Sequence, residues 1–249
     1  MSGFVSLVGA GPGDPRLITL RGVECLRAAD VVAYDRLVAS ELLEHCRPDA
    51  DLRYVGKDPA DASLTQLAIS ELLVTEARAG RVVVRLKGGD PYVFGRGGEE
   101  ALTLREAGIP FEVVPGVSSA FAVPAAAGIP LSMRGIASNF AVVSAHRSGL
   151  DDQPWAAFAQ IDTLVFLMGA AHVAEICARL IDAGRHLQTP AAAVERGTSP
   201  RQREVWAPLG KLPAAFAESG LSAPSTIVVG EVTALARVLR GELAAEAAA

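Results

Sequence analysis

The chain has 249 residues, enough for one large domain or two small ones, and it is 50% hydrophobic and 20% charged, as in ordinary globular proteins. A formal net charge of -5 without any block of basic residues argues against a surface that binds nucleic acid or an anionic membrane. No apolar run reaches the ~18 to 20 residues of a membrane span, and the first residues carry no signal-peptide pattern. We therefore expect a cytoplasmic protein without nucleic-acid or membrane partners.

The first half of the chain alternates between strand and helix patterns. Strands are predicted at 4–8, 31–34, 52–55, 82–86 and 111–114, and helices at 20–30, 41–46, 63–79 and 101–107. Glycines after the third and fourth helices, Gly80 and Gly108, are typical stop signals. Five strands joined by helical crossovers predict an α/β domain with a mostly parallel, doubly wound sheet.

Charged residues and glycines follow three successive strands of this half. Asp35 and Arg36 follow the second strand, Lys57 follows the third, and Gly88, Gly89 and Asp90 follow the fourth. Because open α/β sheets bind ligands at the carboxyl ends of their strands, we expect these residues to meet at one edge.

The loop after the fourth strand has the composition of a binding site. Residues 88–98 contain five glycines, which allow a ligand to approach the main chain closely. The charges Lys87, Asp90, Arg96 and Glu99 have both signs, which suits a ligand with cationic and anionic parts. The chain has only three lysines beside twenty arginines, yet Lys57 and Lys87 both follow strands, which suggests a need for an ammonium group.

The second half restarts the pattern after a turn at Gly116 and Val117. A helix containing Pro124 is predicted at 118–128, strands at 140–144, 163–168, 191–195, 203–207 and 226–230, and helices near 171–183, 209–218 and 231–240. We expect two domains, 1–116 and 117–241, a frayed tail at 242–249, and a ligand in the cleft between the domains.

Other chemistries have weaker support. Cys25, Cys46 and Cys177 are odd in number and far apart, and the four histidines lack metal-ligand spacing, so we expect neither a disulfide framework nor a metal. The glycines at 9, 11 and 13 follow a strand and suggest a dinucleotide-binding oxidoreductase as an alternative. Their spacing differs from that motif, and Pro12 and Pro15 interrupt the start of the helix that would hold a pyrophosphate.

Eight segments together resemble the tetrapyrrole methylase family over essentially the whole chain. Within that family they are most similar to the branch that methylates uroporphyrinogen III. The segments are residues 9–14, 32–38, 54–57, 84–100, 114–119, 127–131, 195–199 and 227–232. Two positions depart from the family pattern: Ser132-Met133 stands before Arg134 where Thr-His is frequent, and Ala145 stands before His146 where glycine is frequent.

The resemblance implies a fold, a cofactor and a partner. It implies two α/β domains, each a five-stranded sheet flanked by helices, with the active site and S-adenosyl-L-methionine in the interdomain cleft, and it implies a homodimer. Its product would be S-adenosyl-L-homocysteine. The positions that match the cofactor pocket are Pro12, Gly88, Gly89, Asp90, Val93, Ser118, Ser119, Met168, Gly197 and Thr226.

The resemblance also implies residue roles. Asp35 matches a proton acceptor and Lys57 a proton donor, while Arg96 and Glu99 match groups discussed for acid–base chemistry or substrate binding. The positions that match contacts to the tetrapyrrole carboxylates are Arg36, Arg134 and His146. A protein with a net negative charge can bind a tetrapyrrole that carries several carboxylates only by gathering arginines in one place, since the planar guanidinium groups pair carboxylates bidentately.

The expected reaction is the addition of two methyl groups to uroporphyrinogen III, giving precorrin-2 through precorrin-1. A sister methylase that acts on a later corrin intermediate is the nearest alternative. The sequence leaves open whether the product enters siroheme, cobalamin or heme d1 synthesis.

Overall fold

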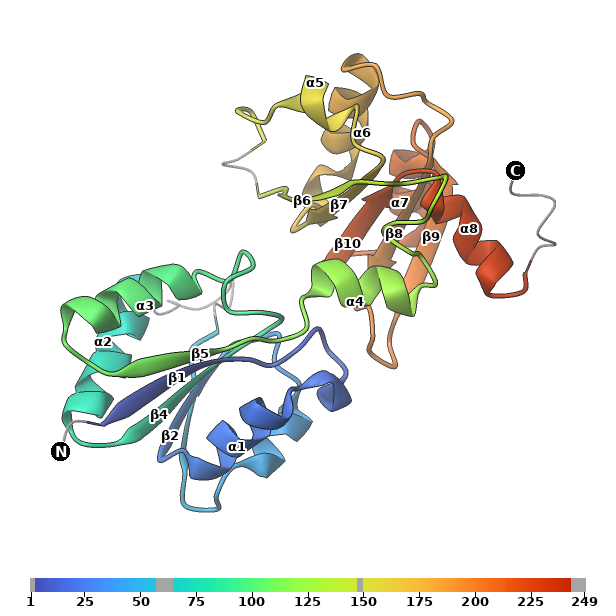
Figure 1. Cartoon of the computed structure of the whole chain (residues 1–249). Coiled ribbons are helices and arrows are strands. Elements are labelled where there is room, and N and C mark those ends of the chain that lie inside the picture. The colour runs from blue at the N-terminus through green and yellow to red at the C-terminus, as the bar shows by residue number, and fades with distance from the viewer. Residues whose placement is uncertain (1–2, 57–64, 147–149, 243–249) are drawn as a thin grey trace. The chain divides into compact units, whose positions relative to one another are not determined.

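The structure is a computed structural model that describes residues 3–56, 65–146 and 150–242 (Figure 1). The chain divides into two compact units, Met1–Ser118 and Ser119–Ala249. Within the described ranges, no helix combines the length and the apolar character of a membrane span.

The first unit contains a five-stranded sheet in the order β3-β2-β4-β1-β5. Every neighbouring pair of strands is parallel, which confirms the parallel sheet predicted for this half. The strands are β1 (Phe4–Gly9), β2 (Val31–Tyr34), β3 (Asp51–Tyr54), β4 (Val82–Lys87) and β5 (Phe111–Val114).

Helices cover both faces of this sheet (Figure 1). The helix α1 and the 3-10 turn η2 pack on one face through Cys25, Leu26 and Leu42, whereas α2 and α3 pack on the other. The elements are η1 (Pro15–Leu17), α1 (Leu20–Ala28), η2 (Ser40–His45), α2 (Gln66–Arg78) and α3 (Gly97–Glu106). The short helix predicted at 41–46 is confirmed, as the 3-10 helix η2.

Local signals explain where the helices of this unit begin and end. The hydroxyls of Thr19 and Thr65 accept backbone N–H groups at the starts of α1 and α2. Gly80 and Gly108, with φ of 84° and 69°, close α2 and α3 in the left-handed conformation, as predicted. Ser63, the predicted start of α2, lies outside the described residues.

The second unit contains a mixed sheet in the order β6-β7-β10-β8-β9. The pair β6 and β7 is parallel, and the other three pairs are antiparallel. The strands are β6 (Phe140–Ser144), β7 (Thr163–Leu167), β8 (Pro190–Glu195), β9 (Arg203–Pro208) and β10 (Ser225–Val229). The predicted strand positions are confirmed, but the sheet does not repeat the parallel pattern, because a direct hairpin joins β8 to β9 and reverses the chain.

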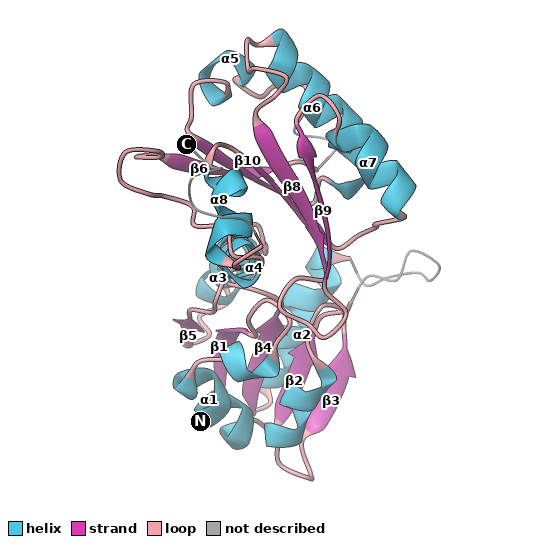
Figure 2. Cartoon of the chain, turned by 90° about the vertical axis from the view of Figure 1, so that its right-hand side faces the viewer, coloured by secondary structure: helices cyan, strands magenta, loops and turns pink. Residues whose placement is uncertain are grey.

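Helices also cover both faces of the second sheet (Figure 2). On one face α5, α6 and α7 place Trp155, Ile176 and Phe216 in a core with Phe166, and α4 and α8 pack on the other face. The elements are α4 (Ser119–Ala126), α5 (Trp155–Phe158), η4 (Ala170–His172), α6 (Val173–Asp182), α7 (Leu212–Ser219) and α8 (Val232–Leu239). The short helix α5 has no counterpart among the predicted elements.

The three cysteines are free thiols. Cys25 and Cys177 are buried and Cys46 is half-buried. Burial raises the pKa of the Cys177 thiol to about 12.

Candidate active site

The carboxyl ends of β2, β3 and β4 meet at one edge of the first sheet, because these strands are parallel neighbours. A cavity of about 330 Å³ lies there. It is lined by Asp35, Arg36, Leu37, Val55, Gly56, Gln66, Ile69, Arg85, Lys87, Gly88, Phe94, Gly95 and Arg96. The structure thus brings together five residues singled out in the sequence, which are Asp35, Arg36, Lys87, Gly88 and Arg96, whereas Lys57 lies outside the described residues.

Glycines hold three loops in backbone contact beside this cavity. Gly89 and Gly11 exchange two main-chain hydrogen bonds, of 2.7 and 3.2 Å, directly before Pro12. A methyl group built on Gly116 would overlap the Gly89 carbonyl oxygen and lie 2.7 Å from Cα of Gly9. Only glycine fits at such an approach, so these residues join the segments that follow β1, β4 and β5.

Asp90 and Arg96 organise the loop between β4 and α3. The carboxylate of Asp90 accepts the N–H of Tyr92 at 2.8 Å and the N–H of Gly116 at 3.0 Å, and Val93 lies half-buried in the same loop. Arg96 has a left-handed backbone with φ of 59°, and its guanidinium donates to both oxygens of Glu99, at 2.8 and 2.6 Å. These hydrogen bonds raise the pKa of Arg96 and hold Glu99 in an ion pair.

Two buried cations that line the cavity, Arg85 and Lys87, share the buried carboxylate of Glu100. Arg85 donates to Asp35 at 2.5 Å and to Glu100 at 3.1 Å, and Lys87 donates to Glu100 at 3.0 Å. Burial, and then the nearby Arg85 charge, lower the pKa of Lys87, although Glu100 and Asp35 oppose the shift. Lys87 lines the cavity but differs from the expectation of an exposed loop residue: it ends β4, its side chain is 3% exposed and it pairs with Glu100.

Sequence reasoning missed Arg85 and Glu100, although two signals could have found them. Residues two apart on a strand point to the same face of the sheet, so the side chains of Arg85 and Lys87 lie on one face. Two cations on one buried face indicate a carboxylate nearby, and Glu100 supplies it. Glu100 lies four residues before the buried Leu104, on the side of α3 that faces the sheet.

The second sheet also gathers predicted site residues at one edge. Thr226 pairs with Leu167 and with Val194, so Thr226 lies at the end of the sheet where Met168 follows β7 and Gly197 follows β8. His146 is at the same edge, because the preceding residue, Ala145, donates its N–H to Leu167 O at 2.8 Å.

The residues at this edge have distinct environments. Met168 has a left-handed backbone, with φ of 60°, and is exposed, a strained conformation of the kind that clusters at functional sites. Thr226 is buried. A methyl group built on Gly197 would lie 2.6 Å from Cγ2 of Val123 on α4, so packing within the unit is sufficient to require glycine there.

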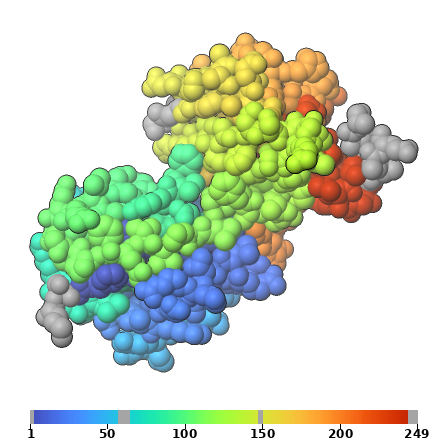
Figure 3. Space-filling view, viewed as in Figure 1, coloured from blue at the N-terminus to red at the C-terminus, as the bar shows by residue number. Residues whose placement is uncertain are grey.

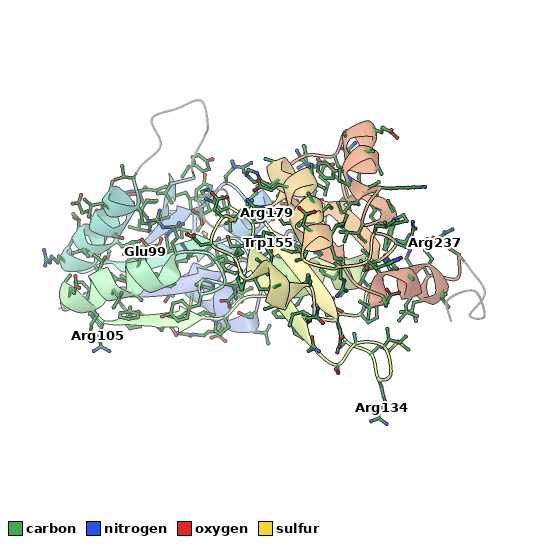
Figure 4. All side chains as sticks on the ribbon, turned by 90° about the horizontal axis from the view of Figure 1, so that it is seen from above. Glu99, Arg105, Arg134, Trp155, Arg179 and Arg237 are labelled. Atoms are coloured by element: carbon green, nitrogen blue, oxygen red, sulfur yellow. The ribbon has the colours of Figure 1, made fainter. Side chains whose placement is uncertain are left out.

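The structure does not bring Arg134 together with His146. Arg134 is exposed in the loop that precedes β6, whereas His146 follows β6, so they belong to opposite ends of that strand. Figure 4 shows the Arg134 side chain projecting from the end of its loop, away from the rest of its unit. The other predicted residues, Ser118 and Ser119, end the first unit and begin α4.

A second cavity, of about 630 Å³, lies beside β8 and β9. It is lined by Glu195, Arg196, Pro200, Arg201, Gln202, Arg203 and Ser222. Its buried carboxylate, Glu195, is already bound by Arg203 at 2.6 Å and by the Ser222 hydroxyl at 2.7 Å. We take the smaller cavity as the candidate active site, because it combines a partly exposed carboxylate with several cations.

The loop after β1 explains why the dinucleotide alternative fits poorly. The glycines at 9, 11 and 13 lead into the 3-10 turn η1, which begins at Pro15, and α1 starts only at Leu20. A pyrophosphate at this loop would therefore not meet the N-terminus of an α-helix, as it does in a dinucleotide-binding fold.

Comparisons with known proteins identify related chains. Siroheme synthases from Chromobacterium violaceum and Stutzerimonas stutzeri are 51% and 48% identical over 237 and 248 residues. These matches cover 94% and 99% of this chain but 50% and 53% of those proteins, so the chain spans about half the length of these relatives.

Solved structures match the chain over nearly their whole length. Uroporphyrin III C-methyl transferase from Thermus thermophilus is 44% identical, with a TM-score of 0.79 over 92% of this chain and 98% of that one. A structure of the Thermus enzyme that contains S-adenosyl homocysteine gives 44% identity, a TM-score of 0.78 and the same coverage. A cobalt precorrin-4 methyltransferase is 28% identical, with a TM-score of 0.84 over 92% of this chain and 95% of that one.

The family model for tetrapyrrole (corrin/porphyrin) methylases matches residues 5–213. This match covers nearly all of the first unit and the second unit as far as the start of α7, and it includes every residue that lines the candidate active site. The chain therefore belongs to the tetrapyrrole methylase family.

Proposed function

We propose that this chain transfers methyl groups from S-adenosyl-L-methionine to two carbons of uroporphyrinogen III, giving precorrin-2 through precorrin-1. The observation that carries the proposal is the cavity at the strand ends of the first sheet, where the Asp35 carboxylate lies among the cations Arg36 and Arg96. The similarity to the Thermus enzyme over nearly all of that chain supports the same substrate.

Substrate binding in this proposal depends first on Arg36. Its side chain is exposed at the cavity and forms no ion pair within the described residues, so its planar fork can pair a carboxylate of the tetrapyrrole. Arg96 is already bound to Glu99, and it must share or exchange that partner to reach substrate. Roles for Arg134 and His146 stay predictions from the family resemblance.

The residues of the first unit fit the proposed cofactor. When bound, S-adenosyl-L-methionine supplies an electrophilic methyl group on a sulfonium that also carries an amino-acid tail and an adenosine. The Gly88-Gly89 backbone has no Cβ atoms to block close approach, and each Asp90 oxygen accepts one N–H, which leaves lone pairs for an ammonium or hydroxyl donor. We propose that these residues, with Pro12 and Val93, hold it. Contacts from Ser118, Ser119, Met168, Gly197 and Thr226 stay predictions.

Asp35 is the proposed proton acceptor. A proton must leave the macrocycle after methylation to restore conjugation, and a general base serves that step. Glu99 is less suited because Arg96 binds both of its oxygens, and Arg96 itself is a poor base because its pKa exceeds ~12. Lys57 as proton donor stays a prediction.

A sister methylase acting on a later corrin intermediate is the second candidate. The TM-score of 0.84 with the cobalt precorrin-4 methyltransferase favours it. The lower identity, 28% against 44% for the Thermus enzyme, argues for uroporphyrinogen III instead.

Product mass tests the proposal. The protein is incubated with isotope-labelled S-adenosyl-L-methionine and enzymatically generated uroporphyrinogen III, and the proposal expects singly and then doubly methylated product. The variant Asp35→Asn serves as a control for background methylation. Labelling of a later corrin precursor without labelling of uroporphyrinogen III would overturn the proposal in favour of the sister activity.

We also propose that the chain forms a homodimer and works in the cytoplasm. The exposed rings of Phe121 and Phe140 meet edge to face, with centroids 6.0 Å apart, and Met133 and Ile136 are further exposed apolar side chains of the second unit. The segment 119–144 that carries them covers much of the face of this unit seen in Figure 3 (green to yellow-green). Light scattering on the purified protein should give twice the chain mass, and a monomer mass at micromolar concentration would refute the dimer.

A further inference from the structure

We propose that Arg85 is a positioning residue that holds Asp35 for proton transfer, and that Glu100 in turn holds Arg85. The inference rests on the proposed function, in which Asp35 is the proton acceptor. It assigns a role to a buried charge network that the substrate and cofactor contacts do not explain.

Arg85 is fixed in one orientation by its partners. Its side chain is 3% exposed, and its guanidinium donates to Asp35 Oδ1 at 2.5 Å and to Glu100 Oε1 at 3.1 Å. The remaining terminal nitrogen lies 3.4 Å from Ala33 O and 3.3 Å from Leu86 O. Because each nitrogen of the planar fork has a partner, Arg85 can fix the direction of the Asp35 carboxylate.

Asp35 is held by one oxygen only. Oδ1 binds Arg85, whereas Oδ2 has no hydrogen-bond partner among the described residues. The side chain is 29% exposed and lines the cavity. The clamp therefore leaves one carboxylate oxygen available to accept a proton.

Glu100 ties this clamp to the body of the unit. Its side chain is fully buried, and Oε1 accepts from Arg85, from Lys87 and from Gln66 at the start of α2. Its other oxygen, Oε2, has no partner within the described part of the chain. A buried charge network with an unsatisfied oxygen contributes little to the free energy of unfolding, since well-packed apolar residues in its place often give a more stable protein.

Arg53 provides a matched control on the same sheet. It also bridges two carboxylates, Asp51 at 2.6 Å and Glu76 at 2.7 Å, but it is more exposed and does not line the cavity. Replacing it removes an arginine with two acidic partners without disturbing Asp35.

A double-mutant cycle tests the inference. Turnover, the Michaelis constant for uroporphyrinogen III and S-adenosyl-homocysteine affinity are measured for Arg85→Met, Asp35→Asn and the double variant. We expect Arg85→Met to lower kcat roughly 10- to 100-fold through misplacement of the base, with KM and cofactor affinity changed less than about threefold. In the Asp35→Asn background the same change should lower kcat no further, since Arg85 acts through Asp35. Arg53→Met should leave kcat unchanged.

Several results would overturn the inference. If Arg85→Met lowers kcat by the same factor in the wild-type and the Asp35→Asn backgrounds, Arg85 acts independently of Asp35. If Arg85→Met leaves kcat unchanged in the wild-type background, Arg85 has no role in turnover. If Arg85→Met does not fold, Glu100→Gln is the second variant, because glutamine has the shape of glutamate but binds the Arg85 guanidinium more weakly. An unchanged kcat in Glu100→Gln would likewise show that the clamp has no role in turnover.

A second readout separates this inference from the proposed function. Urea unfolding of the wild type, Arg85→Met, Asp35→Asn and the double variant measures the coupling between Arg85 and Asp35 without any substrate. We expect the losses of unfolding free energy in the two single variants not to add up to the loss in the double variant. If the unfolding effects are coupled but the wild-type protein does not methylate uroporphyrinogen III, the proposed function is overturned and the clamp is not. Additive unfolding effects would overturn the clamp itself.

Discussion

Replacing Gly97 by alanine should disturb the loop between β4 and α3 that lines the candidate active site, although the same change at Gly98 should not. A methyl group built on Gly97 would overlap the carbonyl oxygen of Pro91 and lie 2.9 Å from its carbonyl carbon. Gly97 also donates its N–H to that oxygen at 3.0 Å, so the two segments cannot simply separate. A methyl group on Gly98 would meet nothing within 4 Å.

The sizes of the two effects follow from these contacts. Carbon atoms touch at about 3.5 Å, so the methyl group on Gly97 would be roughly 0.6 Å too close to the Pro91 carbon. Such overpacking costs about 1 to 3 kcal/mol of unfolding free energy. Gly98→Ala instead removes a flexible residue from α3 and should gain about 0.5 to 1 kcal/mol.

The assay combines stability with ligand binding. Urea unfolding should rank Gly98→Ala above wild type and Gly97→Ala below it. The Michaelis constant for the tetrapyrrole should rise only in Gly97→Ala, because Phe94, Gly95 and Arg96 of the cavity lie between Pro91 and Gly97. Equal stability of the two alanine variants would refute the reasoning.

Three further predictions concern the site and the core. Asp35→Asn should lower turnover by ~10²- to 10⁴-fold with both ligands still bound, whereas Glu99→Gln should cost far less because Glu99 is held by an arginine. Arg36→Leu should raise the Michaelis constant for the tetrapyrrole by the equivalent of roughly 1.5 to 3 kcal/mol, with cofactor affinity unchanged in calorimetry. The pKa of the Cys177 thiol is raised from 9.0 to about 12, so the native state keeps a proton that the unfolded chain loses between those values. Wild-type stability should therefore fall across that pH range by up to about 4 kcal/mol relative to Cys177→Ala, as measured by urea unfolding at several pH values.

Each of these predictions can fail in a distinct way. Normal turnover in Asp35→Asn would mean that solvent or the substrate's own carboxylates accept the proton. Equal loss of substrate and cofactor affinity in Arg36→Leu would indicate a disturbed fold. A constant stability difference between wild type and Cys177→Ala from pH 8 to 12 would contradict the effect of burial on the thiol.

The first sheet was predictable because its signals are local. Strand patterns alternate with capped helices, and a strand that returns through a helix is parallel to its predecessor in such units. The positions of Asp35, Arg36 and Gly88 at one edge follow from that geometry alone. The same geometry accounts for Val55 and Gly56, which follow β3 and line the cavity at this edge.

Other features were hidden because they depend on tertiary context. The direction of β10 is fixed by how the chain returns after α7, which no single segment specifies. The pairing of Lys87 with Glu100 joins a strand to the following helix, and its charges suggested a solvent-facing loop until burial was known. The exposed position of Arg134 likewise depends on the loop conformation and not on its motif.

The contact among Gly9, Gly89 and Gly116 has a mechanical consequence. Three loops that meet through main-chain atoms have no flexible side chains between them to absorb a displacement. A ligand that pushes on the Gly88-Gly89 segment must therefore move the ends of β1 and β5 as well, and the cost of that movement is shared by three strands of one sheet. Stiffness is thus a source of selectivity at this edge: a molecule slightly too large meets the joint resistance of these three strands, without any dedicated side chain to exclude it.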